Sequence, residues 1–440
     1  MTDLSLTKPL THNIIAKNFT NTGISTDLDA YQASGGYQGV NTMLATMSSN
    51  DVIDQVTQSG LKGRGGAGFL TGLKWSFVPR GEGSPTPKYL VANADEMEPG
   101  TFKDRLLMEA DPHQLIEGMI IAAYAMEAQV AYIFLRGEYT RAEKLLHHAI
   151  NECYQNNLLG KNILSSDFSL DLYLHTSAGR YICGEETALL SALEGKRANP
   201  RAKPPFPQVS GAWGKPSVVN NVETLCNLPH ILKNGNEWYH QLSLVNGVQS
   251  KDMGTKLFGV SGRVNNPGCW ELPMGTRIGE IIEEHAGGMS DGYQLKGFLP
   301  GGASTDFLTS DHLNLAMEYE SIAKAGSRMG TGTMIVLDDK TCPVGMVLNI
   351  ERFFAQESCG WCTPCRDGLP WTEQLLQAIE AGHGVMEDLD TLMDHTRFMA
   401  PGNTFCALAP GAMEPLQSAL NYFRDDFEQH IYAKRCPYTK

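Results

Sequence analysis

The chain has 440 residues, and its 49 acidic and 35 basic side chains give a formal net charge of −14 at neutral pH. This acidic excess argues against nucleic acid and anionic lipid as primary partners, because both would repel such a surface. Hydrophobic residues make up 42% and charged residues 19% of the chain, which excludes a disordered or collagen-like protein.

The N-terminal segment carries no recognisable targeting signal. Residues 1–18 are polar and lack the charged and apolar order of a secretion signal. The most apolar stretch, Leu115–Leu135, is interrupted by Glu117 and Glu127 and is predicted to be a buried helix followed by a strand. We therefore predict a soluble cytoplasmic protein without direct membrane insertion, in which grouped cysteines bind metal rather than form disulfides.

The first half of the chain has the pattern of an α/β domain. Residues 1–50 are predicted to be a polar lead-in with a weak helix, and residues 51–245 to be the domain itself. A helix signal at 51–59 runs into a glycine-rich loop. Strands alternating with helices predict βαβ units and a parallel sheet. The predicted strands are 89–92, 131–135 and 170–175.

The second half changes character twice. Residues 246–338 contain a predicted hairpin within 256–272, a short helix at 278–285 and a strand at 334–337, a combination typical of a small β-grasp module. In residues 339–440 the strand signals stop, and this part is predicted to be a helical bundle. Its helical spacing is clearest at Met413, Leu416, Leu420, Phe423 and Phe427.

The strongest chemical signal is a run of three cysteines, Cys359, Cys362 and Cys365, followed 41 positions later by Cys406. Three thiolates at this spacing can face one cuboidal centre, so the run predicts a single [4Fe–4S] cluster. Structural zinc is the alternative, although it usually takes two separated pairs. The other cysteines lack ligand spacing and are predicted to be small core or surface residues. They are Cys153, Cys183, Cys226, Cys269, Cys342 and Cys436.

The glycine-rich loop at 63–68 satisfies the pattern G-x-G-x-x-G. It lacks the preceding strand of a dinucleotide fingerprint, and a structural turn explains its glycines equally well. The residues that follow, Phe69, Lys74, Trp75 and Phe77, supply a cation and aromatic faces. Bare backbone amides can hold phosphate and aromatic rings can stack on a flat ring, which favours a ligand-binding loop.

Two further groups of polar residues follow predicted strands, where ligands of open α/β sheets gather. Asn93, Asp95, Glu96 and Glu98 suit hydrogen bonds to hydroxyl groups, although a solvated acidic turn is the alternative. The second group precedes an apolar helix, and the helix dipole alone would account for its acids. A proline-rich surface loop likewise explains part of the segment downstream. This second group and its downstream continuation comprise Tyr181, Gly184, Glu185, Glu186, Lys203, Phe206, Asn220, Asn221 and Thr224.

Taken in order, these motifs resemble the FMN- and NADH-binding flavoprotein subunits of respiratory NADH:quinone oxidoreductase, complex I. The resemblance runs from about residue 50 to residue 430 and rests on the ordered combination of motifs. It implies a Rossmann-like flavin domain, a small ubiquitin-like (β-grasp, soluble-ligand-binding) domain and a C-terminal helical bundle that carries the iron–sulfur cluster. It also implies an oxidoreductase of a proton-translocating complex, in which NADH gives a hydride to FMN and single electrons pass through the [4Fe–4S] cluster toward quinone.

The resemblance also implies which residues meet each cofactor. FMN would be held by Gly63, Arg64, Gly65, Lys74, Asn93, Asp95, Gly184, Glu185, Asn220, Asn221 and Thr224. NADH would lie against Phe69, Phe77, Glu96, Glu98, Tyr181, Glu186, Lys203 and Phe206. The cluster ligands would be Cys359, Cys362, Cys365 and Cys406. No side chain is needed as a nucleophile; Glu96 and Glu186 would orient the ribose and repel a 2′-phosphate, which predicts NADH over NADPH.

The implied partners are a thioredoxin-like [2Fe–2S] subunit and the large iron–sulfur subunit, in a peripheral arm on the cytoplasmic face of the bacterial inner membrane. The flavin-binding chain of a soluble NAD-dependent hydrogenase or formate dehydrogenase is the alternative. Those chains often carry an extra N-terminal [2Fe–2S] domain, for which the roughly fifty residues before the glycine loop leave no room, so complex I is favoured. A non-catalytic protein with structural zinc is disfavoured because every cofactor motif is present at once.

Overall fold

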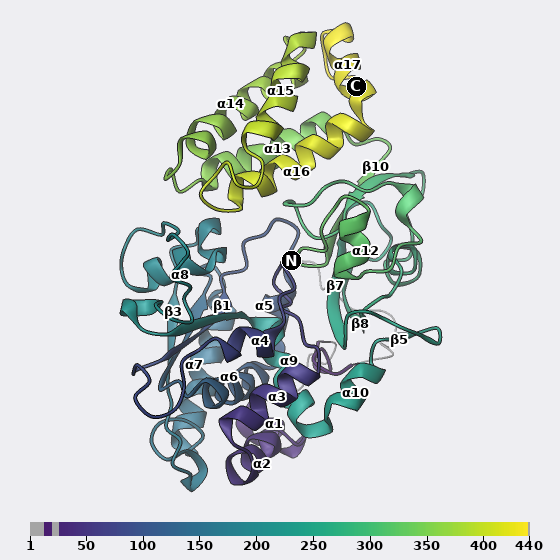
Figure 1. Ribbon diagram of the computed structural model, residues 1–440. Helices are drawn as coiled ribbons and strands as arrows, with labels where there is room; N and C mark the ends of the chain where they lie inside the picture. Colours follow the sequence, from purple (N-terminus) through teal and green to yellow (C-terminus); the bar gives the residue numbers. More distant parts are fainter. Residues whose placement is uncertain (1–12, 20–25, 439–440) are drawn as a thin grey trace. The chain divides into compact units, whose positions relative to one another are not determined.

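The computed structural model describes residues 13–19 and 26–438, so much of the polar N-terminal segment lies outside the described residues. The chain divides into two compact units (Figure 1). The first comprises residues 1–97, 102–257 and 270–275, and the second comprises residues 98–101, 258–269 and 276–440.

A parallel four-stranded sheet forms the centre of the first unit. Its order is β3-β2-β1-β4, so the chain builds outward from β1 in one direction and then adds β4 on the other side. The three predicted strands are confirmed, whereas β4 is an addition to the prediction. The strands are β1 (Tyr89–Ala94), β2 (Val130–Leu135), β3 (Asp171–Thr176) and β4 (Ser217–Asn221).

Helices cover this sheet, and the most buried of them is α6 (Pro112–Met126). It packs with α9 (Val222–Asn234) and against β1. The prediction of a buried helix leading into β2 is therefore confirmed. The predicted helix before the glycine loop is α3 (Ser49–Gln58), which Ser48 and Asp51 begin with a reciprocal capping box. The other helices are α4 (Thr71–Ser76), α5 (Lys103–Ala110), α7 (Thr140–Gln155), α8 (Glu186–Leu193) and α10 (Asn236–Gln241).

The chain before residue 50 contributes more order than a polar lead-in with a weak helix. It forms α1 (Leu28–Ala33) and α2 (Gln38–Thr46), which bury Leu28, Tyr31, Val40 and Met43. The Tyr31 hydroxyl donates to Glu117 on α6 at 2.5 Å, and Tyr37 bonds His113 at 3.0 Å. These helices are therefore part of the core of the first unit.

A second, mixed sheet has the order β8-β7-β10-β9. Its strands β9 and β10 belong to the second unit, whereas β7 and β8 each have residues assigned to both units. Neighbouring β7 and β8 are the predicted hairpin, and β10 is the predicted strand; β10 lies parallel to β7 and antiparallel to β9. The predicted short helix is confirmed as α11 (Ile278–Glu280), continued by one wider turn to His285. The remaining elements are β7 (Thr255–Ser261), β8 (Gly268–Pro273), β9 (Leu295–Leu299), β10 (Thr333–Asp338) and α12 (Tyr319–Lys324).

Five helices form the predicted bundle, drawn in green to yellow in Figure 1. The apolar spacing from Met413 to Phe427 does not belong to one helix, because the first helix ends before Phe423 and a new one begins at Arg424. No helix in the described part of the chain is long and apolar enough to cross a bilayer. The five helices are α13 (Pro343–Glu357), α14 (Thr363–Glu380), α15 (Met386–Phe398), α16 (Leu408–Tyr422) and α17 (Arg424–Ala433).

Candidate functional site

The carboxyl ends of β1 and β4 bring two of the predicted polar segments together. In the register of this parallel pair, Ala92 lies opposite Asn220 and Asn93 lies opposite Asn221. The strand order reverses at this pair, since β2 and β3 lie on the other side of β1. Ligands of open parallel sheets bind at such a reversal, outside the carboxyl ends of the strands.

The glycine-rich loop stands over the end of β4. The loop is closed by a hydrogen bond of 2.8 Å from the Gly63 amide to the Phe69 carbonyl, and Gly68 adopts a positive φ of 70°. A Cβ on Gly65 would lie 2.9 Å from the Asn221 Cβ, which is too close for any other residue type. A Cβ on Gly66 would meet no protein atom within 4 Å, so the loop backbone is open on that side. The glycines therefore allow both a close approach to β4 and an exposed stretch of backbone.

Arg64 turns its guanidinium into the protein. This side chain is fully buried, and its Nη2 donates to the Tyr239 hydroxyl at 3.0 Å and to the Met253 carbonyl at 2.7 Å. The Arg64 amide donates to Thr224 Oγ1 at 2.8 Å. Arg64 and Thr224 thus fix the loop to the domain beneath it.

Beneath the loop lies a buried network of charges that the sequence did not reveal. Glu223 accepts from Lys103 at 2.8 Å and from Lys256 at 3.3 Å, and all three side chains are buried. Lys256 also donates to the Arg64 carbonyl at 2.9 Å. Asp104 completes the network with an ion pair to Lys103 at 2.8 Å and a bond from Asn221 at 2.7 Å. Two lysines therefore sit behind the loop and the Asn221 end of β4.

The network perturbs its own protonation equilibria. Burial would raise the pKa of Glu223, but Lys103 and Lys256 outweigh it and hold that pKa below its usual value. Burial would lower the pKa of Lys103, but the carboxylates of Asp104 and Glu223 raise it. Burial lowers the pKa of Lys256 to about 8. The group is positive on balance at neutral pH once Arg64 is counted, which favours an anionic ligand at the loop above it.

Glu186 lies between two lysines. Lys74 Nζ is 2.9 Å and Lys203 Nζ is 2.7 Å from its carboxylate, so the sequence-predicted cations of two separate segments meet at one acid. Burial would raise the pKa of Glu186, but Lys74 and Lys203 hold it below its usual value. Lys74 also donates to the Val219 carbonyl on β4 at 2.9 Å, which fixes this group beside the end of the sheet.

Glu185 caps the start of α8. It is the N-cap of α8, and its carboxylate accepts from the Thr187 and Ala188 amides at 2.8 Å each. The carbonyl of Gly184, just before it, accepts from Asn93 at 3.3 Å. The end of β1 and the start of α8 are thus joined by a direct hydrogen bond.

Glu96 binds protein groups with its carboxylate. It accepts from the Asp104 and Arg105 amides, at 2.9 and 3.1 Å, and from the Tyr139 hydroxyl at 3.0 Å. Burial, and then repulsion by Asp104, raises the pKa of Glu96 to about 7. Glu96 therefore caps the start of α5 and changes charge near neutral pH.

Two other acids of the same segment lie apart from these contacts. Asp95 is buried directly beside Glu96, and its amide donates to the Asn93 side chain at 3.2 Å. Glu98 belongs to the second unit, where its carboxylate accepts from the Ser304 amide at 2.7 Å. The chain thus passes from the first unit to the second within this acidic segment.

Three of the predicted aromatic residues are exposed to solvent. Phe69, Phe77 and Phe206 have exposed fractions of 51%, 52% and 55%. The rings of Phe69 and Phe77 are 6.4 Å apart and tilted by 45°. Large apolar rings with this much exposure are suited to stacking on a ligand ring, since they contribute little to the core. Trp75, by contrast, is fully buried and donates to Asn220 at 3.0 Å.

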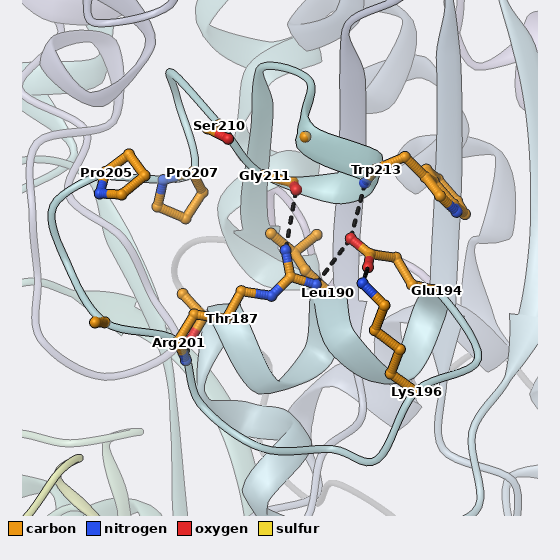
Figure 2. A pocket seen from close by; sticks show the side chains of 12 residues that line it. Thr187, Leu190, Glu194, Lys196, Arg201, Pro205, Pro207, Ser210, Gly211 and Trp213 are labelled. Carbon is orange, nitrogen blue, oxygen red and sulfur yellow. Dashed lines mark hydrogen bonds and ion pairs between the residues drawn. The ribbon is translucent and has the colours of Figure 1, made fainter.

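A separate cavity lies between α8 and the 201–214 segment and encloses about 470 Å³ (Figure 2). Its charged side chains bind one another: Glu194 accepts from Arg201 and the Trp213 amide at 2.8 Å each. Lys196 is 2.6 Å from the same carboxylate group. None of the predicted site residues lines this cavity, so we do not assign the nucleotide to it.

Of the four cysteines of the predicted cluster, Cys359 and Cys362 lie in the loop before α14, Cys365 lies in the first turn of α14, and Cys406 lies in the loop before α16. Burial, and to a smaller extent repulsion from Cys362, Cys406 and Cys359, raises the pKa of Cys365 to about 12. Trp361 and Phe405, which flank the two loops, form an edge-to-face pair with centroids 6.0 Å apart. All ten cysteines lie in the described residues and none forms a disulfide. The donor set of four neighbouring thiols fits a [4Fe–4S] cluster.

Three family models match consecutive parts of the chain. Residues 56–230 match the Nuo51 FMN-binding domain, residues 257–307 match the SLBB domain, and residues 345–430 match the NADH-ubiquinone oxidoreductase-F iron-sulfur binding region. The first matched range contains the glycine loop described above, and the last contains the cysteine motif. Fold and site together define a flavin- and iron–sulfur-dependent oxidoreductase component.

Relatives with assigned names support this class of oxidoreductase. The F subunit of NADH-quinone oxidoreductase in Escherichia coli (strain K12) is 59% identical over 92% of this chain and 89% of its own. The corresponding F 2 subunit of Rhizobium meliloti (strain 1021) is 48% identical over 93% of this chain and 96% of its own. The chain therefore belongs to the family of NADH-quinone oxidoreductase F subunits, the flavoproteins of complex I.

A solved structure shares the fold at lower identity. A chain of the NAD+-reducing [NiFe]-hydrogenase in the H2-reduced state matches with a TM-score of 0.79 and 33% identity, covering 93% of this chain and 67% of its own. The greater identity to the complex I relatives favours complex I over the hydrogenase alternative. The predicted family, oxidoreductase activity and cofactors are confirmed: the chain serves NADH oxidation and electron transfer, with FMN and a [4Fe–4S] cluster.

Proposed function

We propose that the carboxyl ends of β1 and β4, together with the glycine-rich loop above them, hold the FMN. The observation that carries this proposal is the reversal of strand order at Asn93 and Asn221, with an open loop backbone over it and two lysines buried behind it. The residues assigned to FMN are Gly63, Arg64, Gly65, Lys74, Asn93, Asp95, Gly184, Glu185, Asn220, Asn221 and Thr224.

Most of these residues would act through their backbone or through other residues. Arg64, Thr224 and Glu185 position the loop and α8, while loop amides and the exposed side of Gly184 face the ligand. When bound, the flavin links the two-electron chemistry of nicotinamide to the one-electron chemistry of iron–sulfur centres. The chain's own contribution is to bind and orient both nucleotides.

NADH would lie on the side of the loop that carries the exposed aromatic rings. Phe69, Phe77 and Phe206 offer faces for adenine, and Glu186 with its two lysines lies at the start of α8. Tyr181, Glu96 and Glu98 belong to the same proposal. For Glu96 we assign an indirect role, since its carboxylate already accepts three hydrogen bonds from the protein.

We also propose the bounds of the domains and the immediate partners of the chain. We assign residues 51–245 to a Rossmann-like flavin domain, 246–338 to an SLBB domain of the β-grasp kind and 339–440 to the cluster domain, after the lead-in 1–50. Each matched family range falls inside one of these blocks. The immediate partners would be a thioredoxin-like [2Fe–2S] subunit and the large iron–sulfur subunit, in the peripheral arm on the cytoplasmic face of the inner membrane.

The FMN site is tested by substituting a glycine at which an added Cβ would contact the proposed ligand but no protein atom. Gly66→Ala adds a methyl group where no protein atom lies within 4 Å, so the stability of the flavin-free chain should not change. The flavin content after purification should fall by more than about tenfold, the effect of losing about 1.4 kcal/mol of binding. Gly39→Ala in α2, where the new methyl group makes only ordinary contacts, is the matched control and should retain its flavin.

Flavin retention in Gly66→Ala equal to that of the unaltered chain would contradict the assignment of the loop. The wider proposal is checked by purifying the chain from solubilised membranes. Complex I subunits should co-purify with it, and the preparation should show flavin absorbance and a low-temperature EPR signal after NADH. Recovery of a hydrogenase large subunit instead would support the alternative assembly.

A further inference from the structure

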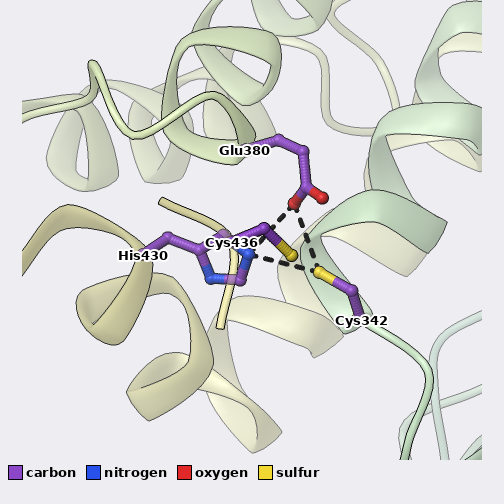
Figure 3. A group of neighbouring side chains, drawn as sticks. All are labelled: Cys342, Glu380, His430 and Cys436. Carbon is purple, nitrogen blue, oxygen red and sulfur yellow. Dashed lines mark hydrogen bonds and ion pairs between the residues drawn. The ribbon is translucent and has the colours of Figure 1, made fainter. Parts of the chain in front are cut away.

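Two cysteines that the sequence left unassigned meet a histidine and a glutamate in the helical bundle. Cys342, Glu380, His430 and Cys436 each place one donor atom so that all four lie within 4.8 Å of one another (Figure 3). They come from the start of α13, the end of α14, the middle of α17 and the tail that follows α17. All four belong to the second unit and are distinct from the four cysteines of the cluster.

The separations fit a single small cation. Cys342 Sγ lies 3.2 Å from Glu380 Oε2 and 3.3 Å from His430 Nε2, and these last two atoms are 3.0 Å apart. With metal–ligand distances of about 2.0–2.3 Å, neighbouring donors of a tetrahedral zinc site lie about 3.3–3.8 Å apart. The observed atoms therefore need only a small outward adjustment to surround one ion.

The orientation of His430 is the second observation. Its Nδ1 lies 2.6 Å from the Asp426 carbonyl, an acceptor only, so Nδ1 carries a proton and donates it there. This leaves Nε2 to face a carboxylate oxygen and a sulfur, all of which are electron-rich atoms. A cation between them satisfies all three at once, and a histidine fixed through its other nitrogen is typical of metal sites.

The surroundings supply the conditions for tight binding. His430 is completely buried and Cys436 is 6% exposed, whereas Cys342 and Glu380 are half-buried, so two of the four ligands are shielded from water. Cys342 is the N-cap of α13, and its sulfur accepts from the Gly345 amide at 3.2 Å. Burial and Glu380 raise the pKa of Cys342 well above its usual range, and the Gly345 amide only partly offsets them, so the thiol loses its proton as the cation binds.

We propose that these four side chains form a structural Zn²⁺ site that anchors α17 and the C-terminal tail to α13 and α14. Two sulfurs, one imidazole nitrogen and one carboxylate oxygen complete a tetrahedron with no position left for water, which is the form of a structural rather than a catalytic site. Binding releases the two thiol protons and leaves a net charge of −1 at the site. It involves no redox step and is independent of the flavin proposal.

The test measures metal in the full-length chain carrying its flavin and cluster. Elemental analysis should give one zinc per chain besides the cluster iron, and zinc X-ray absorption should show two sulfur and two nitrogen or oxygen neighbours. His430→Gln and Cys436→Ser should each lower zinc to below about a tenth of an equivalent, because outer-shell changes alone already cost about 10–100-fold in affinity. Cys269→Ser, a buried cysteine outside the site, is the matched control and should keep its zinc.

Four outcomes would overturn the proposal. They are absence of zinc after growth with added zinc, equal zinc in both variants and the control, a zinc with four sulfur neighbours, and a mass lower by two hydrogens that maps to a Cys342–Cys436 disulfide. Flavin and iron content report separately on the proposed function, so its failure is distinguishable from failure of the zinc site.

Discussion

In the first unit, the charged side chains around the strand ends form ion pairs with one another. In the helical bundle, cysteine and histidine side chains instead gather in groups that could each surround a metal centre. Glu186 is held by Lys74 and Lys203, and Glu223 by Lys103 and Lys256. On the proposed assignment, the ligand-facing surface of the first unit is mainly backbone and exposed aromatic rings. In the bundle, the same proposal makes the side chains of Cys359, Cys362, Cys365 and Cys406 the ligands themselves.

This difference predicts how each region responds to substitution. At a site made of backbone groups and supporting ion pairs, one substitution lowers the affinity only in part, because several groups together position the ligand. A site made of direct metal ligands loses its metal when one ligand is removed, because each bond is a large part of the binding free energy.

The largest effect is expected from Cys365→Ser. This substitution removes a buried cysteine that we assign to the cluster, and the iron content should fall to near zero with loss of the low-temperature EPR signal of the cluster. NADH:quinone activity of the assembled complex should fall by more than about 100-fold, beyond the range of outer-shell changes. Cys226→Ser, at a buried position of the first unit, serves as the control and should leave iron unchanged. Full iron in Cys365→Ser would contradict the ligand assignment.

The second effect concerns the buried charges beneath the glycine loop. Glu223→Gln leaves Lys256 without its anion in a fully buried position, so the free energy of unfolding should fall by about 3–5 kcal/mol. Glu138→Gln breaks an exposed pair with Arg136 in the same unit and should change it by less than about 1 kcal/mol. Denaturant unfolding of both variants measures the difference. A similar loss of stability in Glu223→Gln and Glu138→Gln would mean that the buried network does not support the loop.

The sequence predicted elements that have a local signal. The strands β1, β2 and β3 and the bundle helices follow from apolar spacing, and the cluster from cysteines two residues apart. It missed β4, which is five residues long and polar at both ends. It also missed the pairing of Glu223 with Lys256, 33 positions away, and the convergence of Cys342 with His430, 88 positions away. Contacts between such distant residues leave no period or spacing in the sequence.

The same limit applies to the direction in which a predicted side chain points. Arg64 was predicted as a cofactor cation, yet its guanidinium contacts Tyr239 and Met253. The spacing of Phe423 and Phe427 continued a helical pattern, yet the chain begins a new helix at Arg424, with Asp425 and Asp426 in its first turn. Residue type and spacing identify the segment, whereas packing decides which atoms of it face the ligand.

The third effect concerns the choice between NADH and NADPH. Glu186→Gln removes the carboxylate paired with Lys74 and the nearer of the two carboxylates paired with Lys203, since Glu185 lies 3.4 Å from Lys203 Nζ. Lys74 in particular should then attract a 2′-phosphate. The ratio of kcat/KM for NADH to that for NADPH should fall by about tenfold, equivalent to about 1.4 kcal/mol. Steady-state rates with both nucleotides and ferricyanide measure it. An unchanged ratio would exclude Glu186 from the discrimination.

The pH dependence of this ratio separates Glu186 from Glu96. The pKa of Glu186 is held below its usual value by its lysines, so this carboxylate stays charged throughout pH 6–8. Its contribution to stability is present above the unfolded pKa of 4.5 and is lost only as the pH falls through the lower folded value. Glu96, with a pKa raised to about 7, gains its charge as the pH rises through that range. The 2′-phosphate also gains charge in this range, since its second pKa is about 6, so the ratio is compared with that of Glu96→Gln. An identical rise in the two proteins is expected, and a rise that Glu96→Gln abolishes would indicate Glu96.

The smallest effect is expected from Glu185→Ala, one residue before Glu186. Glu185 caps α8 through the Thr187 and Ala188 amides, so its loss should lower the free energy of unfolding by about 1 kcal/mol. The nucleotide ratio should change less than in Glu186→Gln, because the shorter hydrogen bonds from Lys74 and Lys203 to Glu186 remain and only the 3.4 Å pair between Lys203 and Glu185 is lost. Unfolding and steady-state rates measured on one preparation compare the two roles directly. A changed ratio with unchanged stability would reverse the roles of these adjacent acids and place the charge that selects NADH on the cap itself.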